Sequence, residues 1–158
     1  MDNVSFSLPA GVTLGLVGES GAGKSTVAFS ILRLIEPPGE IMSGRVEFQG
    51  QDLMALSNKE MEKIRGNRIC MIFQDPMSTL NPLYRIGDQI TEGLLLHRGI
   101  SRKEAREQAV AALREVGIPS PELRARAYPH ELSGGMQQRA IIAAGIALKP
   151  ALIIADEP

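Results

Sequence analysis

The sequence lacks several features that would place it in other classes of protein. Its single cysteine, Cys70, excludes an internal disulfide and a cysteine metal cluster, and it suits a reducing compartment. Neither sign of charge is in excess, because 17 Lys and Arg residues against 18 Asp and Glu residues give a net charge of −1. A general electrostatic affinity for nucleic acid or for an anionic membrane is therefore not indicated. No apolar run reaches the roughly 18 residues of a membrane-spanning helix, so we expect a soluble protein or part of one.

What is present is an alternation of strand-like and helix-like segments. Apolar runs predict buried strands at residues 12–17, 69–73 and 151–155, and alternation predicts another strand at 45–48 with a turn at Gln49–Gly50. Helical patterns cover residues 27–35, 58–65, 86–97, 102–116 and 134–148, with a short helix and a connector between 119 and 132. Capping boxes are predicted at Ser57 and Ser101, and a serine cap at Ser133. This order predicts an α/β fold with a mainly parallel sheet, interrupted by a helical insert.

A glycine-rich segment follows the first predicted strand and opens the first predicted helix. Its spacing, a glycine, four residues and then Gly-Lys-Ser, is that of a P-loop, in which glycines let backbone N–H groups converge on a phosphate. The helix that follows points the positive end of its dipole at the same phosphates. A plain glycine-rich turn is the alternative, but the strand–loop–helix context favours nucleotide binding by Gly18, Glu19, Ser20, Gly21, Ala22, Gly23, Lys24, Ser25 and Thr26.

Charged and hydroxyl side chains in two places fit phosphate chemistry. Lys24 can reach the β- and γ-phosphates, and the Ser25 hydroxyl can ligate Mg²⁺. The last apolar run ends in Asp156 and Glu157, at the carboxyl edge where parallel sheets bind ligands. Asp156 is predicted to hold Mg²⁺ opposite Ser25, and Glu157 to orient the attacking water or accept its proton. The alternative is a strand that simply leaves the core through solvated charges.

The last predicted helix begins with a serine and two glycines. A hydroxyl, unpaired N–H groups and a helix dipole make a second anion site at Ser133, Gly134 and Gly135. A helix cap explains the serine but not two glycines in the first turn, because glycine lowers helix stability. The segment reads Leu-Ser-Gly-Gly-Met-Gln-Gln-Arg from Leu132 to Arg139.

Together these segments resemble the nucleotide-binding subunit of ATP-binding cassette (ABC) transporters. Residues 18–26 match the Walker A loop, Gln74 the Q-loop glutamine, residues 132–138 the signature, and residues 152–156 the Walker B strand. Residues 74–82 and 128–131 resemble the oligopeptide and dipeptide importer branch. The resemblance covers the whole chain and implies a P-loop NTPase (RecA-like) fold. Its ATPase core would be residues 1–80 and 133–158, and residues 81–132 would form a helical subdomain.

The resemblance also implies roles for individual residues. Gln74 would contact Mg²⁺ or the attacking water and sense the γ-phosphate. The metal would be held by Ser25, Gln74 and Asp156, and hydrolysis would depend on Lys24, Gln74 and Glu157. ATP held by a second subunit, facing this one head to tail, would contact Ser133, Gly134, Gly135 and Gln138.

The protein implied is an ATP-binding and ATP-hydrolysing subunit that energises a membrane importer for peptides. It would be a peripheral subunit on the cytoplasmic face of the cell membrane. Its partners would be a second ATP-binding subunit, identical or different, and membrane-spanning permease subunits, without nucleic acid. A soluble ABC-type ATPase of DNA repair or translation, and a non-catalytic fragment, are the alternatives.

Two parts of the family pattern fall outside these residues. One is the aromatic residue that stacks on adenine upstream of the P-loop, and the other is the D-loop with the switch histidine after Walker B. We therefore expect a fold that is incomplete at both ends. Because the missing strand would lie between residues 12–17 and 151–155, we expect the 158 residues alone to be marginally stable, prone to aggregation and inactive as an ATPase.

Overall fold

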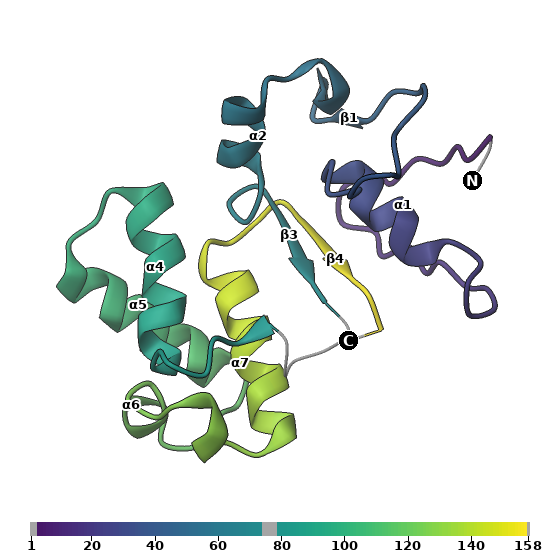
Figure 1. Ribbon diagram of the computed structural model, residues 1–158. Helices are drawn as coiled ribbons and strands as arrows, with labels where there is room; N and C mark the ends of the chain where they lie inside the picture. Colours follow the sequence, from purple (N-terminus) through teal and green to yellow (C-terminus); the bar gives the residue numbers. More distant parts are fainter. Residues whose placement is uncertain (1–2, 74–78, 158) are drawn as a thin grey trace. The chain divides into compact units, whose positions relative to one another are not determined.

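A computed structural model describes residues 3–73 and 79–157 of the chain. The chain divides into two compact units, Met1–Met54 and Ala55–Pro158, and each is described by itself (Figure 1). The first unit contains the glycine-rich loop. The second contains the parallel strands and the signature segment.

The first unit has one helix and one small hairpin. Helix α1 is Lys24–Ile31, and the antiparallel strands β1 (Glu47–Phe48) and β2 (Gln51–Asp52) pair Glu47 with Asp52. Gln49 and Gly50 both have positive φ, of 50° and 79°, as a two-residue hairpin turn with right-handed strand twist requires. A short 3₁₀ helix, Leu53–Ala55, follows. The strand and turn predicted here are confirmed.

Two predictions for the first unit are wrong. Residues 12–17 form no regular strand, and their side chains are exposed, Val17 to 98%. A strand needs a neighbour for its N–H and C=O groups, and none of the described strands pairs with this segment. The helix predicted at 27–35 starts earlier, at Lys24 in the glycine-rich loop, and ends at Ile31. Two residues later, Arg33 has a positive φ of 53°.

The second unit contains a parallel strand pair and a group of helices. Its elements are α2 (Asn58–Ile64), β3 (Ile69–Ile72), α4 (Ile86–Arg98), α5 (Arg102–Glu115), α6 (Pro121–Arg124), a 3₁₀ helix (Pro129–Glu131), α7 (Gly134–Ala147) and β4 (Leu152–Ala155). Strands β3 and β4 are parallel, with Ile69 opposite Leu152 and Ile72 opposite Ala155. The parallel pairing and the helical stretch between the strands agree with the sequence prediction.

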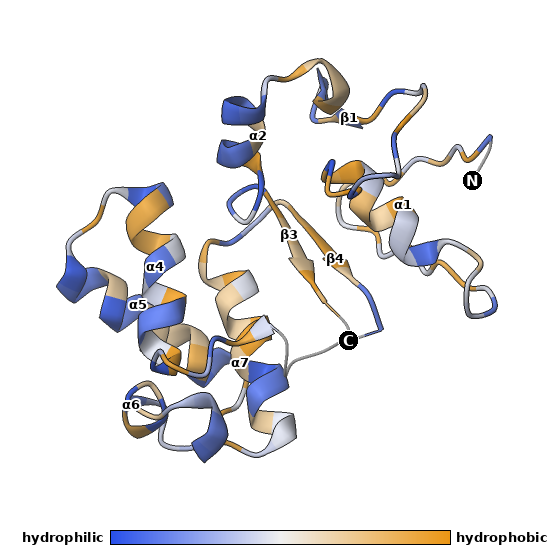
Figure 2. Cartoon of the chain, in the orientation of Figure 1, coloured by the Kyte–Doolittle hydropathy of each residue, from blue (hydrophilic) through white to orange (hydrophobic). Residues whose placement is uncertain are grey.

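The two parallel strands differ in burial, although both are apolar (Figure 2). Strand β3 is almost wholly buried, because α7 packs against it. Strand β4 alternates between half-buried and exposed residues, and Ile153 is 44% exposed. The prediction that residues 151–155 are buried is therefore wrong. Within the described residues β4 pairs only with β3, which leaves its other edge without a partner strand.

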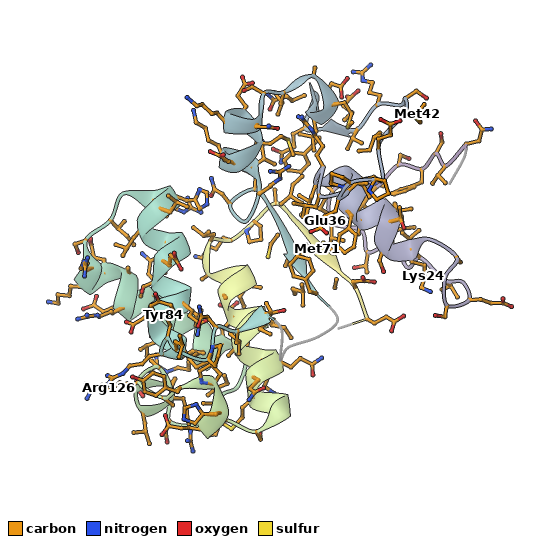
Figure 3. The ribbon with its side chains drawn as sticks, viewed as in Figure 1. Lys24, Glu36, Met42, Met71, Tyr84 and Arg126 are labelled. Carbon is orange, nitrogen blue, oxygen red and sulfur yellow. The ribbon has the colours of Figure 1, made fainter. Side chains whose placement is uncertain are left out.

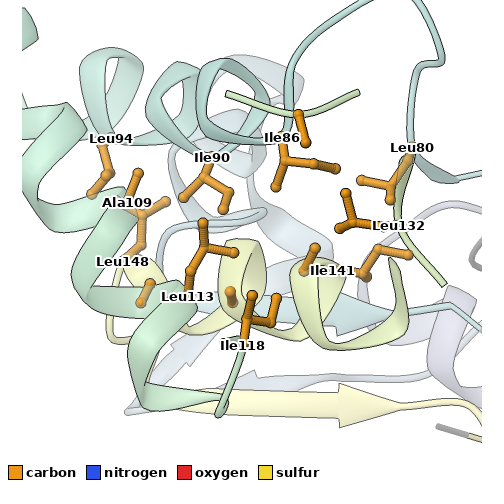
Figure 4. Packing of buried hydrophobic residues seen from close by; sticks show 14 of the residues in the cluster. Leu80, Ile86, Ile90, Leu94, Ala109, Leu113, Ile118, Leu132, Ile141 and Leu148 are labelled. Atoms are coloured by element: carbon orange, nitrogen blue, oxygen red, sulfur yellow. The ribbon is translucent and has the colours of Figure 1, made fainter. Parts of the chain in front are cut away.

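The core of the second unit lies between α4, α5 and α7 (Figure 4). Its fully buried large side chains include Ile86 and Leu94 of α4 and Leu113 of α5. Helices α4 and α5 are amphipathic, so burying their apolar faces against each other and against α7 removes those faces from water. In the described part of the chain, no helix has both the length and the apolar character needed to cross a membrane.

Two serine capping boxes set the start of α2 and of α5, as predicted. The Ser57 N–H donates to Glu60 Oε2 at 2.8 Å, and the Glu60 N–H donates back to Ser57 Oγ at 3.4 Å. Ser101 and Glu104 form the same pair of bonds at 2.9 and 3.2 Å. Hydrogen bonds from the serine side chain, and then from its backbone, lower the pKa of Glu60 and of Glu104.

Helix α4 is attached at both ends to distant parts of the same unit. At its start, the N–H groups of Ile86 and Gly87 donate to the carbonyls of Ala127 and Ala125, at 2.9 and 2.8 Å. At its end, the Arg98 guanidinium donates to the carbonyl of Leu148, just after α7. The helical stretch is thereby tied to the segment before the signature and to the end of α7.

Candidate functional site

Two glycines of the glycine-rich loop have a left-handed backbone conformation. Gly21 and Gly23 have φ of 81° and 93°, in the left-handed region where any side chain would be strained. Gly23 is also the N-cap of α1, and no side chain caps this helix. The first N–H groups of α1 are therefore left for another acceptor. The residues of the predicted cradle thus form a left-handed turn that opens directly into a helix.

Lys24 is folded back over this loop. Its ammonium group donates hydrogen bonds to the carbonyl oxygens of Gly18 and Glu19, at 2.9 and 3.0 Å (Lys24 is labelled in Figure 3). The Ala22 N–H also donates to the Glu19 carbonyl at 3.1 Å, which closes the turn. The loop therefore holds the Lys24 ammonium group against its own carbonyl oxygens. From there the ammonium can form hydrogen bonds to a bound anion instead.

The other predicted residues of this segment differ in exposure. Ser25 lies in the first turn of α1 and is half-buried, while Thr26 beside it is exposed. Glu19 and Ser20 are exposed, as a loop that binds through its backbone requires. A Cβ on Gly18 would lie 3.3 Å from the Ala22 Cβ, which is a tight contact.

The acidic end of β4 lies in the second unit. The Asp156 N–H donates to the carbonyl of Ile72 at 3.0 Å, which extends the β3–β4 ladder by one step. Asp156 is half-buried, and Glu157, with a positive φ of 49°, is exposed. Both carboxylates therefore follow the carboxyl ends of parallel strands, as predicted. Gln74, two residues beyond β3, lies outside the described residues.

The signature segment begins helix α7. Ser133 is the N-cap, with φ of −66° and ψ of 157°, and Gly134 and Gly135 form the first turn. The predicted serine cap is wrong in one respect, because the Ser133 side chain makes no capping hydrogen bond. A Cβ on Gly134 or on Gly135 would meet no atom within 4 Å, and neither has a positive φ. Among residues 3–73 and 79–157, no contact from outside α7 therefore requires glycine at these two positions.

Gln137, which was not among the predicted site residues, holds the backbone before this segment. It is 7% exposed, and its amide nitrogen donates to the carbonyl oxygens of Pro129 and Leu132 at 2.8 and 3.3 Å. The predicted ligand Gln138, next to it, is half-buried. A signal for Gln137 exists in the sequence: it stands three and four residues before the apolar Ala140 and Ile141, and so on the buried face of the helix.

Rings stack beside this backbone. The rings of Tyr128 and His130 lie parallel, with centroids 5.7 Å apart, and the Arg85 guanidinium lies 5.7 Å from the Tyr128 centroid. The Tyr128 N–H donates to Glu131 Oε2 at 2.7 Å. Ring contacts of Tyr128 therefore stabilise the connector from Tyr128 to Leu132. Hydrogen bonds of its own backbone N–H groups stabilise it as well.

Comparison with known proteins gives consistent matches. The model of the ABC transporter family matches residues 1–158. The chain is 48% identical over 158 residues to the dipeptide transport ATP-binding protein DppD of Escherichia coli (strain K12), covering 100% of this chain and 48% of that protein. It is 53% identical over 156 residues to the oligopeptide transport ATP-binding protein OppD of Bacillus subtilis (strain 168), covering 98% of this chain and 44% of that protein. The chain thus spans about half the length of the curated relatives it matches.

Solved structures of ABC transporter cassettes are also similar to this chain. The dimeric structure of a bacterial ABC transporter cassette superposes with a TM-score of 0.74 at 33% identity, covering 87% of this chain and 57% of that one. The same cassette in a post-hydrolysis state bound to ADP and phosphate gives the same values. The α/β P-loop NTPase fold predicted from the sequence is confirmed by these neighbours.

Proposed function

The chain belongs to the ABC transporter family, and from this premise we propose that it binds and hydrolyses ATP as the energy-coupling subunit of a peptide importer. The relatives named for dipeptide and oligopeptide transport support the choice of peptides. The division into an ATPase core, residues 1–80 and 133–158, and a helical subdomain, residues 81–132, belongs to the same proposal.

The observation that carries the proposal is the conformation of the glycine-rich loop. Left-handed Gly21 and Gly23 place uncapped N–H groups of α1 next to the Lys24 ammonium, which rests on two carbonyl oxygens. Phosphates attract both kinds of group: N–H dipoles bind the oxygens, and the lysine offsets their negative charge. A triphosphate suits this loop better than a neutral ligand does.

The residues available for Mg²⁺ fit that ion. The Ser25 hydroxyl and the Asp156 carboxylate supply oxygen ligands, the type that Mg²⁺ prefers, and Gln74 supplies a third in the proposal. When bound, Mg²⁺ would neutralise negative charge on the phosphate oxygens.

The proposed reaction is an in-line displacement by water. Glu157 orients the water and accepts its proton as the water oxygen bonds to the γ-phosphorus. The bond between the γ-phosphorus and the bridging oxygen then breaks, and ADP and phosphate leave. Lys24 stabilises the charge that develops on the phosphoryl oxygens, and Gln74 helps to place the water.

The remaining proposed roles concern partners. Ser133, Gly134, Gly135 and Gln138 bind the ATP that is held by the P-loop of a second, head-to-tail subunit. The open space around Gly134 and Gly135 supports this role, since no contact with the described residues outside α7 explains these glycines. Membrane-spanning permease subunits would hold the protein at the cytoplasmic face of the membrane, and no nucleic acid is expected.

The test uses the complete gene product that contains these residues. In Lys24→Ala, ATP binding should weaken and hydrolysis should disappear. In Glu157→Gln, ATP should still bind while hydrolysis falls by roughly a hundredfold or more, the usual contribution of a general base. Bound ATP should then hold two subunits together, which light scattering would detect. Lys103→Ala and Glu107→Gln, the same changes at exposed positions of α5, serve as controls.

Normal turnover in Lys24→Ala would refute the assignment of the phosphate loop. A Glu157→Gln protein that hydrolyses ATP normally and remains monomeric would refute both the base and the paired arrangement. Capture of membrane permease subunits by the tagged protein supports the importer, whereas capture of DNA-repair or ribosomal partners instead would favour a soluble ABC-type ATPase.

A further inference from the structure

Helices α2, α5 and α7 all begin after a serine in the same extended conformation, but they use it differently. At α2 and α5 the serine oxygen accepts the N–H of a glutamate three residues later, and the glutamate closes the capping box. At α7 the third residue is Met136, which has no group to close such a box. The Ser133 side chain accordingly makes no capping bond.

A different residue fixes the chain where it enters α7. The Gln137 amide nitrogen, buried one turn inside the helix, donates to the Pro129 and Leu132 carbonyls at 2.8 and 3.3 Å. Pro129 is itself buried, and its carbonyl also accepts the Leu132 N–H at 3.0 Å. Gln137 therefore connects α7 to the first residue of the 3₁₀ helix and to the residue that follows it. These two bonds do not involve the Ser133 side chain.

We propose that Gln137 is a positioning residue for the signature segment: its buried amide holds the Pro129–Leu132 backbone, so that the Ser133 hydroxyl remains available to a phosphate. The inference rests on the function proposed above and extends it. In an ordinary N-cap the serine oxygen is used by the helix itself, which removes it as a ligand for anything else. At α7, Gln137 fixes the backbone that leads into the helix, and Ser133 supplies the hydroxyl.

The hydrogen bonds of the first turn fit this division. The N–H groups of Met136 and Gln137 both donate to the Ser133 carbonyl at 2.9 Å. The N–H groups of Gly134 and Gly135 stand ahead of them, in the part of a helix that has no intrahelical acceptor. Neither glycine has a side chain, and no described residue outside α7 lies within 4 Å of the Cβ positions, so an external oxygen can approach these donors and the hydroxyl together.

The test separates positioning from general stability. It uses the complete gene product in a Glu157→Gln background, in which bound ATP persists. Gln137→Met keeps the length of the side chain and removes both N–H donors. Gln108→Met makes the same change at an exposed position of α5 and serves as the matched control. ATP affinity of the single subunit is measured by calorimetry, and ATP-driven association by sedimentation.

We expect Gln137→Met to weaken ATP-driven association by about tenfold, the effect of losing one to two net hydrogen bonds. ATP affinity of the single subunit should stay within about twofold of the parent, because the phosphate loop is untouched. Gln108→Met should associate like the parent. If Gln137→Met does not fold, Gln137→Leu replaces it: this shorter apolar side chain also removes both donors, and the same split is expected.

Association of Gln137→Met equal to that of the parent would overturn this inference alone. So would a parallel loss of single-subunit ATP affinity, because Gln137 would then support the fold in general. Failure of the parent protein to associate in ATP would instead overturn the proposed function, and this inference with it.

Discussion

The contact between α7 and β3 gives a prediction whose sign depends on one sulfur atom. A Cβ at Gly145, in the last turn of α7, would lie 2.9 Å from Cys70 Sγ and 3.7 Å from Ile72 Cγ1. The first distance is too short for a carbon and a sulfur that are not bonded, while the second is ordinary contact. Gly145→Ala should therefore force α7 and β3 apart or rotate the cysteine.

The net effect follows from two opposing terms. Overpacking a core typically lowers stability by about 1–3 kcal/mol. Alanine in place of glycine inside a helix raises stability by about 1 kcal/mol. Gly145→Ala should thus lower the free energy of unfolding by about 1 kcal/mol. In a Cys70→Ala background the sulfur is gone, and the same substitution should raise that free energy by about 1 kcal/mol.

The measurement is urea unfolding of the parent, both single variants and the double variant. The expected coupling between the two positions is about 2 kcal/mol, well above the scatter of such cycles. Gly93→Ala is the matched control, because this α4 glycine would place its Cβ 3.5 Å from Leu148 Cδ1, which is ordinary contact. It should raise stability equally with or without Cys70. A stabilising Gly145→Ala in both backgrounds would refute the close approach of α7 to β3.

Two further predictions concern the helical part of the second unit. Gly87→Ala should lower the free energy of unfolding by about 2 kcal/mol in urea unfolding, because its Cβ would lie 2.7 Å from the Ala125 carbonyl oxygen, a backbone atom that cannot rotate away. No loss would mean that the start of α4 is not held against that carbonyl. Ser101→Ala should raise the pKa of Glu104 toward its ordinary value in a carboxyl NMR titration, while the pKa of Glu60 stays low. Because the folded pKa is lowered, the stability from this box is present above the unfolded pKa and lost as pH falls through the folded pKa, so parent and variant should converge in acid.

The sequence predicted best the features that depend on neighbouring residues. The capping boxes at Ser57 and Ser101 need only a glutamate three residues later, and both form. Local chemistry of this kind does not need the rest of the fold in order to act.

Features that depend on distant partners were predicted less well. Residues 12–17 have the composition of a buried strand, but composition does not supply the neighbouring strand that would satisfy their backbone. The predicted burial of β4 was wrong for a related reason. Helix α7 packs against β3, and the composition of the two strands does not show which of them the helix covers. The bonds from Gln137 to Pro129 and Leu132 join segments whose approach no sequence period reveals.

The attachment of α4 at both ends affects how the second unit unfolds. A free helix frays from its ends inward, since its terminal groups hold nothing. In α4 the first N–H groups are bonded to the segment after α6, and Arg98 reaches a carbonyl 50 residues further along the chain. Closing so long a loop orders much of the chain before the bond is gained. The ends of α4 should consequently open together with α7 and not ahead of it, which makes the helices between β3 and β4 a single cooperative unit.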